Sequence, residues 1–257
     1  MELGVQREKL YKYRSLDGAH KARVERMFTH NELYFPSPHQ FNDPFDCRVE
    51  LSLGGSDNEK KEYIARLISQ YSPDISPADK ISLKSRMLRT SNLRNIGAEV
   101  LDQITNDLGI FSLSKKSDDI LMWSHYANSH RGVCLGFFAG PGDDFFRISQ
   151  EVRYRPDYPS TKLNDDQMTR MEATILTKSD HWSYEEEYRI IDYASGPGIK
   201  TFPPDLLACV IMGCQIDEQD REDVIRWSRN SPSKPSVFQA KKTHRDFSLQ
   251  LREIIIR

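Results

Sequence analysis

The sequence predicts an α+β fold: a single mixed, largely antiparallel sheet with flanking helices and one helical insertion. Segments with strand and helix patterns occur in mixed order along the 257 residues. No internal repeat, low-complexity tract or Gly/Ser-rich linker divides the chain. A polar block at about 57–106 has helical periodicity and lies between strand signals. We therefore expect one α+β domain over residues 1–257, with a helical insert at about 57–106.

The first elements follow from short apolar patterns. Residues 10–14 read as a strand, and Asp17-Gly18 offers a start for a helix whose apolar residues recur at helical spacing through Phe28. A second strand at 33–35 stops before Pro36, and residues 41–46 read as a turn in which Asn42 or Asp43 bonds the backbone. Within the insert, Ser-Pro pairs at 72–73 and 76–77 separate two helices, the second reaching residue 108.

The later elements are assigned by the same reasoning. In chain order we expect a strand at 109–114, a helix at 118–128 with an Asp cap, strands at 132–138 and 152–154, a helix at 165–178, a buried strand at 207–213, a helix at 217–229 and a last strand at 236–240.

The stretch 181–191, His-Trp-Ser-Tyr-Glu-Glu-Glu-Tyr-Arg-Ile-Ile, is the most informative part of the chain. It reads as a strand, so Glu185, Glu187 and Arg189 would share one face, while Tyr188 and Ile190 take the other. A row of like charges on a strand costs stability. Such a row is easier to explain if the charged side chains line a functional cleft. The alternative is an edge strand with its acids in water. We expect the ionic row to face one cleft together with Tyr13 or Arg14.

Composition limits the function classes. The 36 basic and 38 acidic side chains nearly cancel to a formal charge of −2, so no whole-molecule field draws the chain to nucleic acid or an anionic membrane. The start lacks a secretory signal pattern, and no apolar run approaches the roughly 20 residues of a spanning helix. We expect a cytoplasmic protein that does not bind membranes.

Several common sites find no support in the sequence. The four cysteines form no Cys-x-x-Cys pair and are expected to be reduced, and no His-Glu-x-x-His occurs, so no metal site is predicted. The glycines near Cys134 match neither a P-loop nor a dinucleotide fingerprint, and no Gly-x-Ser-x-Gly is present.

Two further segments carry candidate site residues. On the strand 10–14, Arg14 could grip a phosphate or carboxylate with its guanidinium, or the tyrosines could pack inward with the cations in solvent. On the helix at 118–128, Trp123 and Tyr126 fall on one side, a pattern typical of core packing, and His125 lies off that face. His125 would act as a general base only if it faces a cleft.

Five motifs together resemble the bacterial domain-of-unknown-function family 2971. They are Tyr-Lys-Tyr-Arg at 11–14, Phe-Asn-Asp-Pro-Phe-Asp at 41–46, Phe-Ser at 111–112, Met-Trp-Ser-His-Tyr at 122–126 followed by His-x-Gly-Val-Cys-Leu-Gly-Phe at 130–137, and Trp-x-x-Glu-x-Glu-x-Arg at 182–189. A weaker similarity is to ADP-ribosyltransferases, which place a basic residue, a Ser or Tyr, and a Glu-x-Glu in this order.

The second resemblance implies an activity and a site. The protein would be an NAD-dependent ADP-ribosyltransferase-like enzyme acting on a nucleic acid or protein acceptor, in toxin or phage-defence biology. Glu187, Glu185 and Arg14 would be catalytic, and NAD would be the substrate. The residues that would contact NAD are Tyr13, Arg14, Ser112, Trp123, His125, Tyr126 and Arg189. Glu187→Gln would then abolish turnover and leave the fold intact, because it removes only the charge.

Two other function classes stay open at this stage. One is a magnesium-dependent nuclease or nucleotide hydrolase that uses Asp43, Asp46, Glu185 and Glu187, because hard cations take carboxylate ligands. The other is a non-catalytic module that binds a nucleotide or a protein.

Overall fold

A computed structural model describes residues 8–52, 56–88, 105–140, 145–162 and 165–256. The chain divides into two compact units. The first unit comprises residues up to 37, 108–152 and 181–257, and the second comprises 38–107 and 153–180. The expectation of one domain with an insert at 57–106 stays a prediction.

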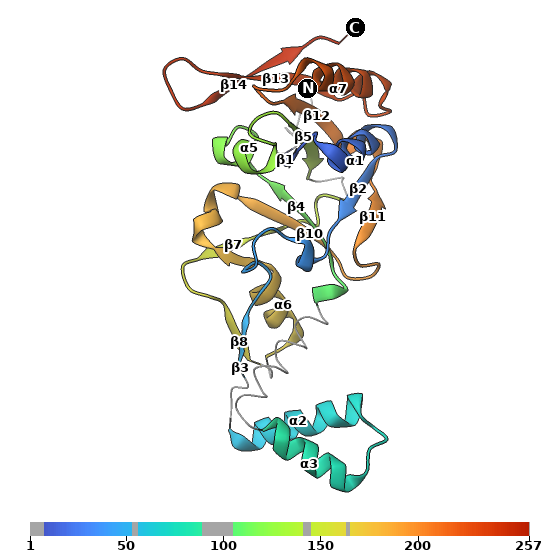
Figure 1. Cartoon of the computed structure of the whole chain (residues 1–257), viewed down its shortest axis with the longest axis vertical. Coiled ribbons are helices and arrows are strands. Elements are labelled where there is room, and N and C mark those ends of the chain that lie inside the picture. The colour runs from blue at the N-terminus through green and yellow to red at the C-terminus, as the bar shows by residue number, and fades with distance from the viewer. Residues whose placement is uncertain (1–7, 53–55, 89–104, 141–144, 163–164, 257) are drawn as a thin grey trace, which may run out of the picture. The chain divides into compact units, whose positions relative to one another are not determined.

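The first unit is built on an eight-stranded sheet (Figure 1). In spatial order its strands are β14 (Leu249–Ile254), β13 (Ser236–Lys242), β12 (Leu207–Met212), β5 (Val133–Ala139), β1 (Glu8–Arg14), β4 (Gly109–Ser114), β10 (Glu187–Asp192) and β6 (Gln150–Glu151). β12 and β13 pair in parallel and all other neighbours are antiparallel. This confirms the predicted α+β class with a mixed, largely antiparallel sheet.

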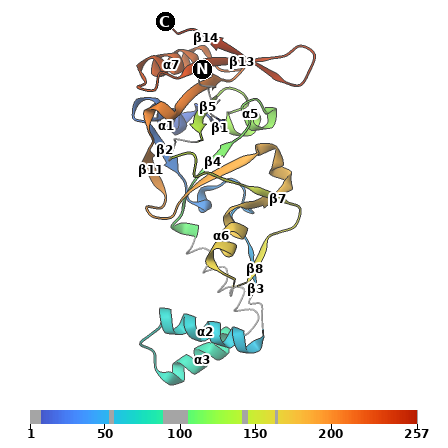
Figure 2. The ribbon, with the colours of Figure 1, turned by 180° about the vertical axis from the view of Figure 1, so that it is seen from behind.

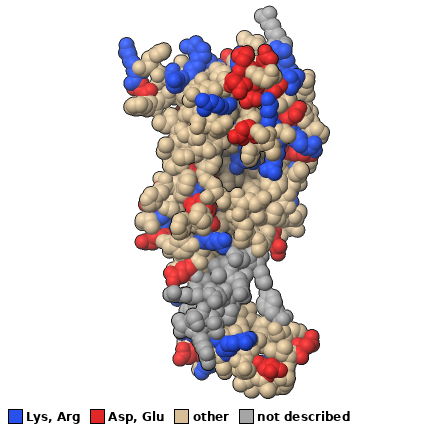
Figure 3. All heavy atoms as spheres, in the orientation of Figure 1, with Lys and Arg blue, Asp and Glu red and all other residues tan. Residues whose placement is uncertain are grey.

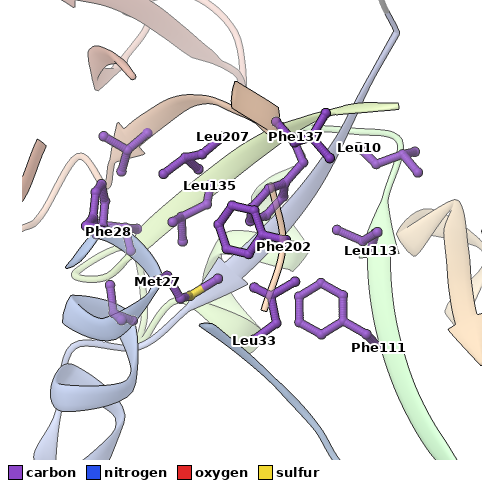
Figure 4. Close-up of a cluster of buried hydrophobic side chains, with 14 of the residues drawn as sticks. Leu10, Met27, Phe28, Leu33, Phe111, Leu113, Leu135, Phe137, Phe202 and Leu207 are labelled. Carbon is purple, nitrogen blue, oxygen red and sulfur yellow. The ribbon is translucent and has the colours of Figure 1, made fainter. Parts of the chain in front are cut away.

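One face of this sheet carries the main hydrophobic core. Helices α1 (Gly18–Thr29) and α7 (Glu218–Asn230) contribute Val24, Met27, Phe28, Val224 and Trp227 to it, residues three or four apart that form one apolar stripe on each helix. Figure 4 shows side chains from α1 and from the strands converging on Phe202, which precedes the 3₁₀ turn η3 (Pro204–Leu206).

The opposite face is covered by the short helix α5 (Ile120–Tyr126). Figures 1 and 2 show α5 and α1 on opposite sides of β1 and β5. The Asp119 carboxylate accepts hydrogen bonds from the backbone N–H groups of Leu121 and Met122, so it caps the helix as the sequence predicted. Met122 and Trp123 are buried against Tyr13 and Cys134 in a second, smaller cluster.

A two-stranded ribbon of β2 (Glu32–Phe35) and β11 (Gly198–Thr201) completes the first unit. Asp192 at the end of β10 forms an ion pair of 2.8 Å with Lys200 on β11 and accepts hydrogen bonds from the N–H groups of Ala194 and Ser195. Burial alone would raise the pKa of the Asp192 carboxyl, but these hydrogen bonds outweigh burial and lower the pKa from 3.8 to about 2.

The lowered pKa of Asp192 predicts a specific pH dependence. A carboxyl whose pKa is depressed by folding stabilises the protein above its unfolded pKa, and this contribution is lost as pH falls through the folded value. The contribution is at most about 2 kcal/mol and should disappear between about pH 4 and pH 2. In urea titrations across this range, Asp192→Asn should be less stable than the wild type at pH 7 and show a flatter acid limb. A curve that matches that of the wild type would contradict the contacts described for Asp192. Asp157→Asn, at an exposed carboxylate, serves as the control.

The second unit combines helices with two short strand pairs. Its helices are α2 (Asp57–Tyr71), α3 (Pro77–Met87), α6 (Gln167–Ile175) and the 3₁₀ turn η1 (Pro38–Gln40), and its strands are β3 (Glu50–Ser52), β7 (Arg153–Arg155), β8 (Ser160–Lys162) and β9 (Thr177–Ser179). β3 pairs with β8 and β7 with β9, both in parallel. Ser56 and Glu59 form a capping box at α2, and Ser76 caps α3, as serines before helical patterns predict. The expected extension of the second helix to residue 108 falls mostly on residues 89–104, which lie outside the described residues.

The structure corrects four expectations about elements. The segment 181–191 is not one strand, because residues up to 185 form the 3₁₀ turn η2 (Asp180–Glu185) before β10 begins. The helix expected at 165–178 ends at Ile175, and β9 follows it. The strand at 236–240 is not the last, because β14 pairs with β13 in a hairpin. The short strands β3, β8 and β11 were not expected. Within the described part of the chain, every helix is too short or too polar to cross a bilayer.

Candidate functional site

The centre of the candidate site is a buried ion pair on β10. Arg189 donates from Nε to Glu187 Oε1 at 2.7 Å and from Nη2 to Glu187 Oε2 at 2.9 Å. Glu187 lies opposite Ser114 and Arg189 opposite Ser112 on β4, which confirms that the two side chains share one face. Their residues are 4% and 0% exposed, and β10 lies between β4 and β6. The edge-strand alternative is therefore wrong, and the pair is enclosed and does not line an open cleft.

Glu185 belongs to the turn before the strand and not to the strand itself. The chain reverses at Glu186, whose φ is 39°, a left-handed value that an extended strand does not contain. Glu186 forms an ion pair of 2.8 Å with Lys116, and its carbonyl oxygen accepts from the N–H of Lys115. The expectation that Glu185 follows strand alternation with Glu187 is thus wrong, although both acids lie at the same end of β10.

Glu185 is tied to the helix α5. The residue is 3% exposed, and its Oε1 accepts a hydrogen bond of 2.6 Å from the hydroxyl of Tyr126. This length is typical of a hydroxyl that donates to a charged carboxylate, a bond roughly twice as strong as a neutral one. The bond joins two segments 59 residues apart in the sequence, the C-terminal end of α5 and the turn η2.

Aromatic rings surround this bond. His125, Tyr126, Trp182 and Tyr184 form what we call the aromatic patch. The ring centroids of His125 lie 6.4 Å from Tyr126, 6.4 Å from Trp182 and 6.2 Å from Tyr184, and Trp182 and Tyr184 are 6.0 Å apart. Tyr126, Trp182 and Tyr184 are half-buried and His125 is exposed, so the rings remain accessible. Such a patch offers stacking surfaces for a planar ligand.

Tyr13 and Trp123 support the site from within. Tyr13 points to the same sheet face as Glu187, because Tyr11 lies opposite Ser114, which itself lies opposite Glu187. The buried Tyr13 hydroxyl donates to the Lys116 carbonyl at 2.9 Å, and burial raises the pKa of this phenol far above its usual value. The Trp123 ring is fully buried edge-on to Tyr13, and its indole N–H donates to the Ser117 carbonyl at 3.0 Å. The expected contact of Trp123 with NAD is corrected accordingly: its ring belongs to the core.

Arg14 lies on the other face of the sheet. It follows Tyr13 directly on β1, so its side chain points away from Glu187. Burial, and then repulsion from Arg23, lower the pKa of Arg14 to about 10. The sequence left open whether Tyr13 or Arg14 would share the ionic face, and the structure selects Tyr13. Arg14 therefore does not share a face with these acids, and its expected catalytic role stays a prediction. Ser112 is half-buried on β4, opposite Arg189, and its expected contact with NAD stays a prediction.

The sequence reasoning missed three residues of this region. Trp182 and Tyr184 complete the aromatic patch, and Lys116 binds Glu186 beside it. The signal for the aromatics was present in the motif Trp-x-x-Glu-x-Glu-x-Arg, but a strand assignment would have placed Trp182 and Tyr184 on the face opposite Glu185. Nothing in the sequence near Lys116 indicated its pairing.

The carboxylates expected for magnesium are distributed over both units. Asp43 accepts a hydrogen bond from the N–H of Phe45, as the turn prediction required, and Asp46 forms an ion pair of 3.5 Å with Lys178, all within the second unit. Glu185 and Glu187 belong to the first unit. Among the residues that the structure describes, no group of three or more His, Cys, Asp or Glu side chains is arranged to hold a metal ion.

Comparison with known proteins supports one of the two resemblances. Residues 122–190 match the model of a family described as Protein of unknown function (DUF2971). The matched range contains Tyr126, the strand β5, the aromatic residues of η2 and the Glu187–Arg189 pair. Neither a curated protein nor a solved structure matches the chain significantly.

Proposed function

We propose that the first unit carries an NAD-dependent ADP-ribosyltransferase-like activity directed at a nucleic acid or protein acceptor. A cytoplasmic location and a role in toxin or phage-defence biology belong to the same proposal. The observation that carries it is the buried Glu185 carboxylate, held by Tyr126 at 2.6 Å within a patch of accessible aromatic rings.

The chemistry of NAD cleavage needs these two features together. When the bond between nicotinamide and ribose breaks, nicotinamide leaves with the electron pair and the ribose becomes oxocarbenium-like. A carboxylate near the developing positive charge stabilises this state, and an aromatic ring can stack on a planar base. The acceptor then forms the new bond to the ribose and gives up a proton, for which a carboxylate is a suitable base.

Their different partners support different roles for the two acids within this proposal. We assign the electrostatic role to Glu185, because Tyr126 of the aromatic patch binds its carboxylate, and we treat Glu187, bound by Arg189 through both oxygens, as a positioning residue. Lys116 is half-exposed and bound to Glu186. We assign it, in place of Arg14, as the cation that binds the diphosphate of NAD. Tyr126, Trp182 and Tyr184 are the rings that would contact the nicotinamide or the adenine.

A second candidate is supported by the same ion pair. The carboxylate of Glu187 is neutralised by a fully buried arginine, and such a pair can have a purely structural role. This favours a non-catalytic module that binds a nucleotide or protein at the aromatic patch. In that case NAD or another planar ligand would bind without turnover.

Incubation of the purified protein with NAD should release free nicotinamide, measured by chromatography, with water taking the ribosyl group where no acceptor is supplied. We expect equal release with and without EDTA, because the proposed step uses no metal. Binding of NAD without release, measured by calorimetry, would favour the binding module. Cleavage of nucleic acid or nucleotides that EDTA stops would favour the magnesium-dependent class. Either result would contradict the proposed transfer.

A further inference from the structure

A hollow lies in the first unit, apart from the residues of the aromatic patch. It is a cavity of about 750 Å³ lined by Cys214, Ile216, Arg221, Gln239, Ala240, Lys241, Lys242, Thr243 and His244. We call it the β13 pocket, because most of these residues belong to β13 and the turn after it. Small-molecule sites in proteins typically measure about 300–1,000 Å³, so the volume suits a metabolite.

The lining of the β13 pocket is cationic. It includes Arg221, Lys241 and Lys242 but no carboxylate. Arg221 pairs with Glu218 at 3.0 Å, whereas Lys241 and Lys242 form no ion pair with any residue in the described ranges. Figure 3 shows Lys and Arg side chains projecting where Figure 1 places the β13–β14 hairpin. Two cations without counter-charges beside a hollow favour an anionic ligand.

The pocket also has fixed walls and an apolar part. The side-chain amide of Gln239 donates to the carbonyl oxygens of Gly213 at 2.9 Å and Met212 at 3.3 Å, which ties the end of β12 to the middle of β13. Ile216, which is half-buried, supplies apolar surface. A single phosphate group would occupy only a small part of this volume, so the remaining space suits an organic group.

We propose that the β13 pocket binds a phosphate-bearing small molecule of the nucleoside diphosphate class. Arg221, Lys241 and Lys242 supply the positive charge for the phosphates, the two lysines from opposite faces at the end of β13, and Ile216 contacts the organic part. Lysine and arginine are the usual protein partners of phosphate oxygens. This site shares no residue with the aromatic patch, and it does not depend on the proposed transferase activity. The two sites contact the same buried cluster around Tyr13 and Trp123. Tyr126 and Tyr184 of the aromatic patch pack against this cluster, and so does Cys214 of the β13 pocket.

Cys214 provides a reporter within the pocket. It is half-buried, whereas Cys47, Cys134 and Cys209 are buried. Burial raises the pKa of the Cys214 thiol, so alkylation by a maleimide is best followed at mildly alkaline pH. Bound ADP should slow modification of Cys214, as identified by mass spectrometry, and inorganic pyrophosphate should protect less because it lacks the organic part. Protection is compared with and without ligand within each variant, because nearby Lys242 itself lowers the pKa of this thiol.

The double variant Lys241→Glu/Lys242→Glu should weaken ADP binding, measured by calorimetry, by about tenfold or more. Lys61→Glu/Arg66→Glu on the exposed side of α2 makes the same charge change in the second unit and should leave binding unchanged. Loss of binding in the first variant only, together with protection of Cys214, supports the proposal. Absence of ADP binding at millimolar concentration, or equal binding by both variants, would overturn it. Equal protection by pyrophosphate and ADP would overturn the contact with Ile216.

Discussion

Glu187→Gln should lower the free energy of unfolding by about 3–5 kcal/mol, as measured by urea denaturation at pH 7. The substitution leaves the guanidinium of Arg189, which is 0% exposed, without the bidentate carboxylate that compensates it. A buried charge that loses its partner costs far more than the pair itself contributes to stability. The expectation from sequence that this variant keeps its fold undisturbed is therefore revised.

Two matched variants test the cause of this loss. Glu186→Gln removes the neighbouring acid, whose pair with Lys116 is more than two-fifths exposed on both sides, and should cost no more than about 1 kcal/mol. Glu187→Leu combined with Arg189→Met removes both charges and should recover much of the stability lost in Glu187→Gln. A change below about 0.5 kcal/mol in Glu187→Gln itself would show that the pair is not enclosed as described.

The instability also governs how activity data are read. Loss of turnover in Glu187→Gln would not identify a catalytic group unless the folded fraction were measured in the same preparation. Glu185, which is bound by a neutral hydroxyl, is the better residue for that purpose.

The shared face of Glu187 and Arg189 could be predicted from sequence because side chains on a strand alternate with a period of two. The same period separates Tyr13 from Arg14. It does not say which of them meets Glu187, because that depends on the register between strands. The pairing of Tyr11 with Ser114, and of Ser114 with Glu187, shows that Tyr13 lies on the face of Glu187.

Glu185 was misplaced for a local reason. Aromatic residues and the β-branched residues that follow them favour extended structure, so the whole stretch 181–191 read as a strand. The left-handed backbone of Glu186 interrupts it, and glutamate gives no sequence signal for such a conformation. The result is a site whose acids come from a turn and a strand, a difference that strand periodicity alone could not reveal.

The hairpin partner β14 was missed although its sequence alternates. Leu249 and Leu251 pack against the cluster around Tyr13, while Arg252 and Glu253 are exposed on the edge of the sheet. Charged residues are common on edge strands, and they weaken the apolar signal that identifies a strand from sequence.

Glu185→Gln should lower the rate of nicotinamide release by on the order of a hundredfold or more. The amide keeps the size of the side chain and an oxygen that accepts the hydrogen bond from Tyr126, but it removes the negative charge that a developing ribosyl cation requires. The measurement is the initial rate with saturating NAD, corrected for the folded fraction. Glu185→Gln should also lose less free energy of unfolding than Glu187→Gln.

Tyr126→Phe is the matched control for this prediction. It keeps the ring in the aromatic patch and removes only the hydroxyl that holds Glu185, so the carboxylate stays charged but is less well oriented. A loss of about tenfold is expected, between the wild type and Glu185→Gln. Full activity in Glu185→Gln would remove this carboxylate from the mechanism. Because Glu187 is bound by Arg189, the proposed transfer would then lose the acid assigned to it, and the non-catalytic binding module would be the better account.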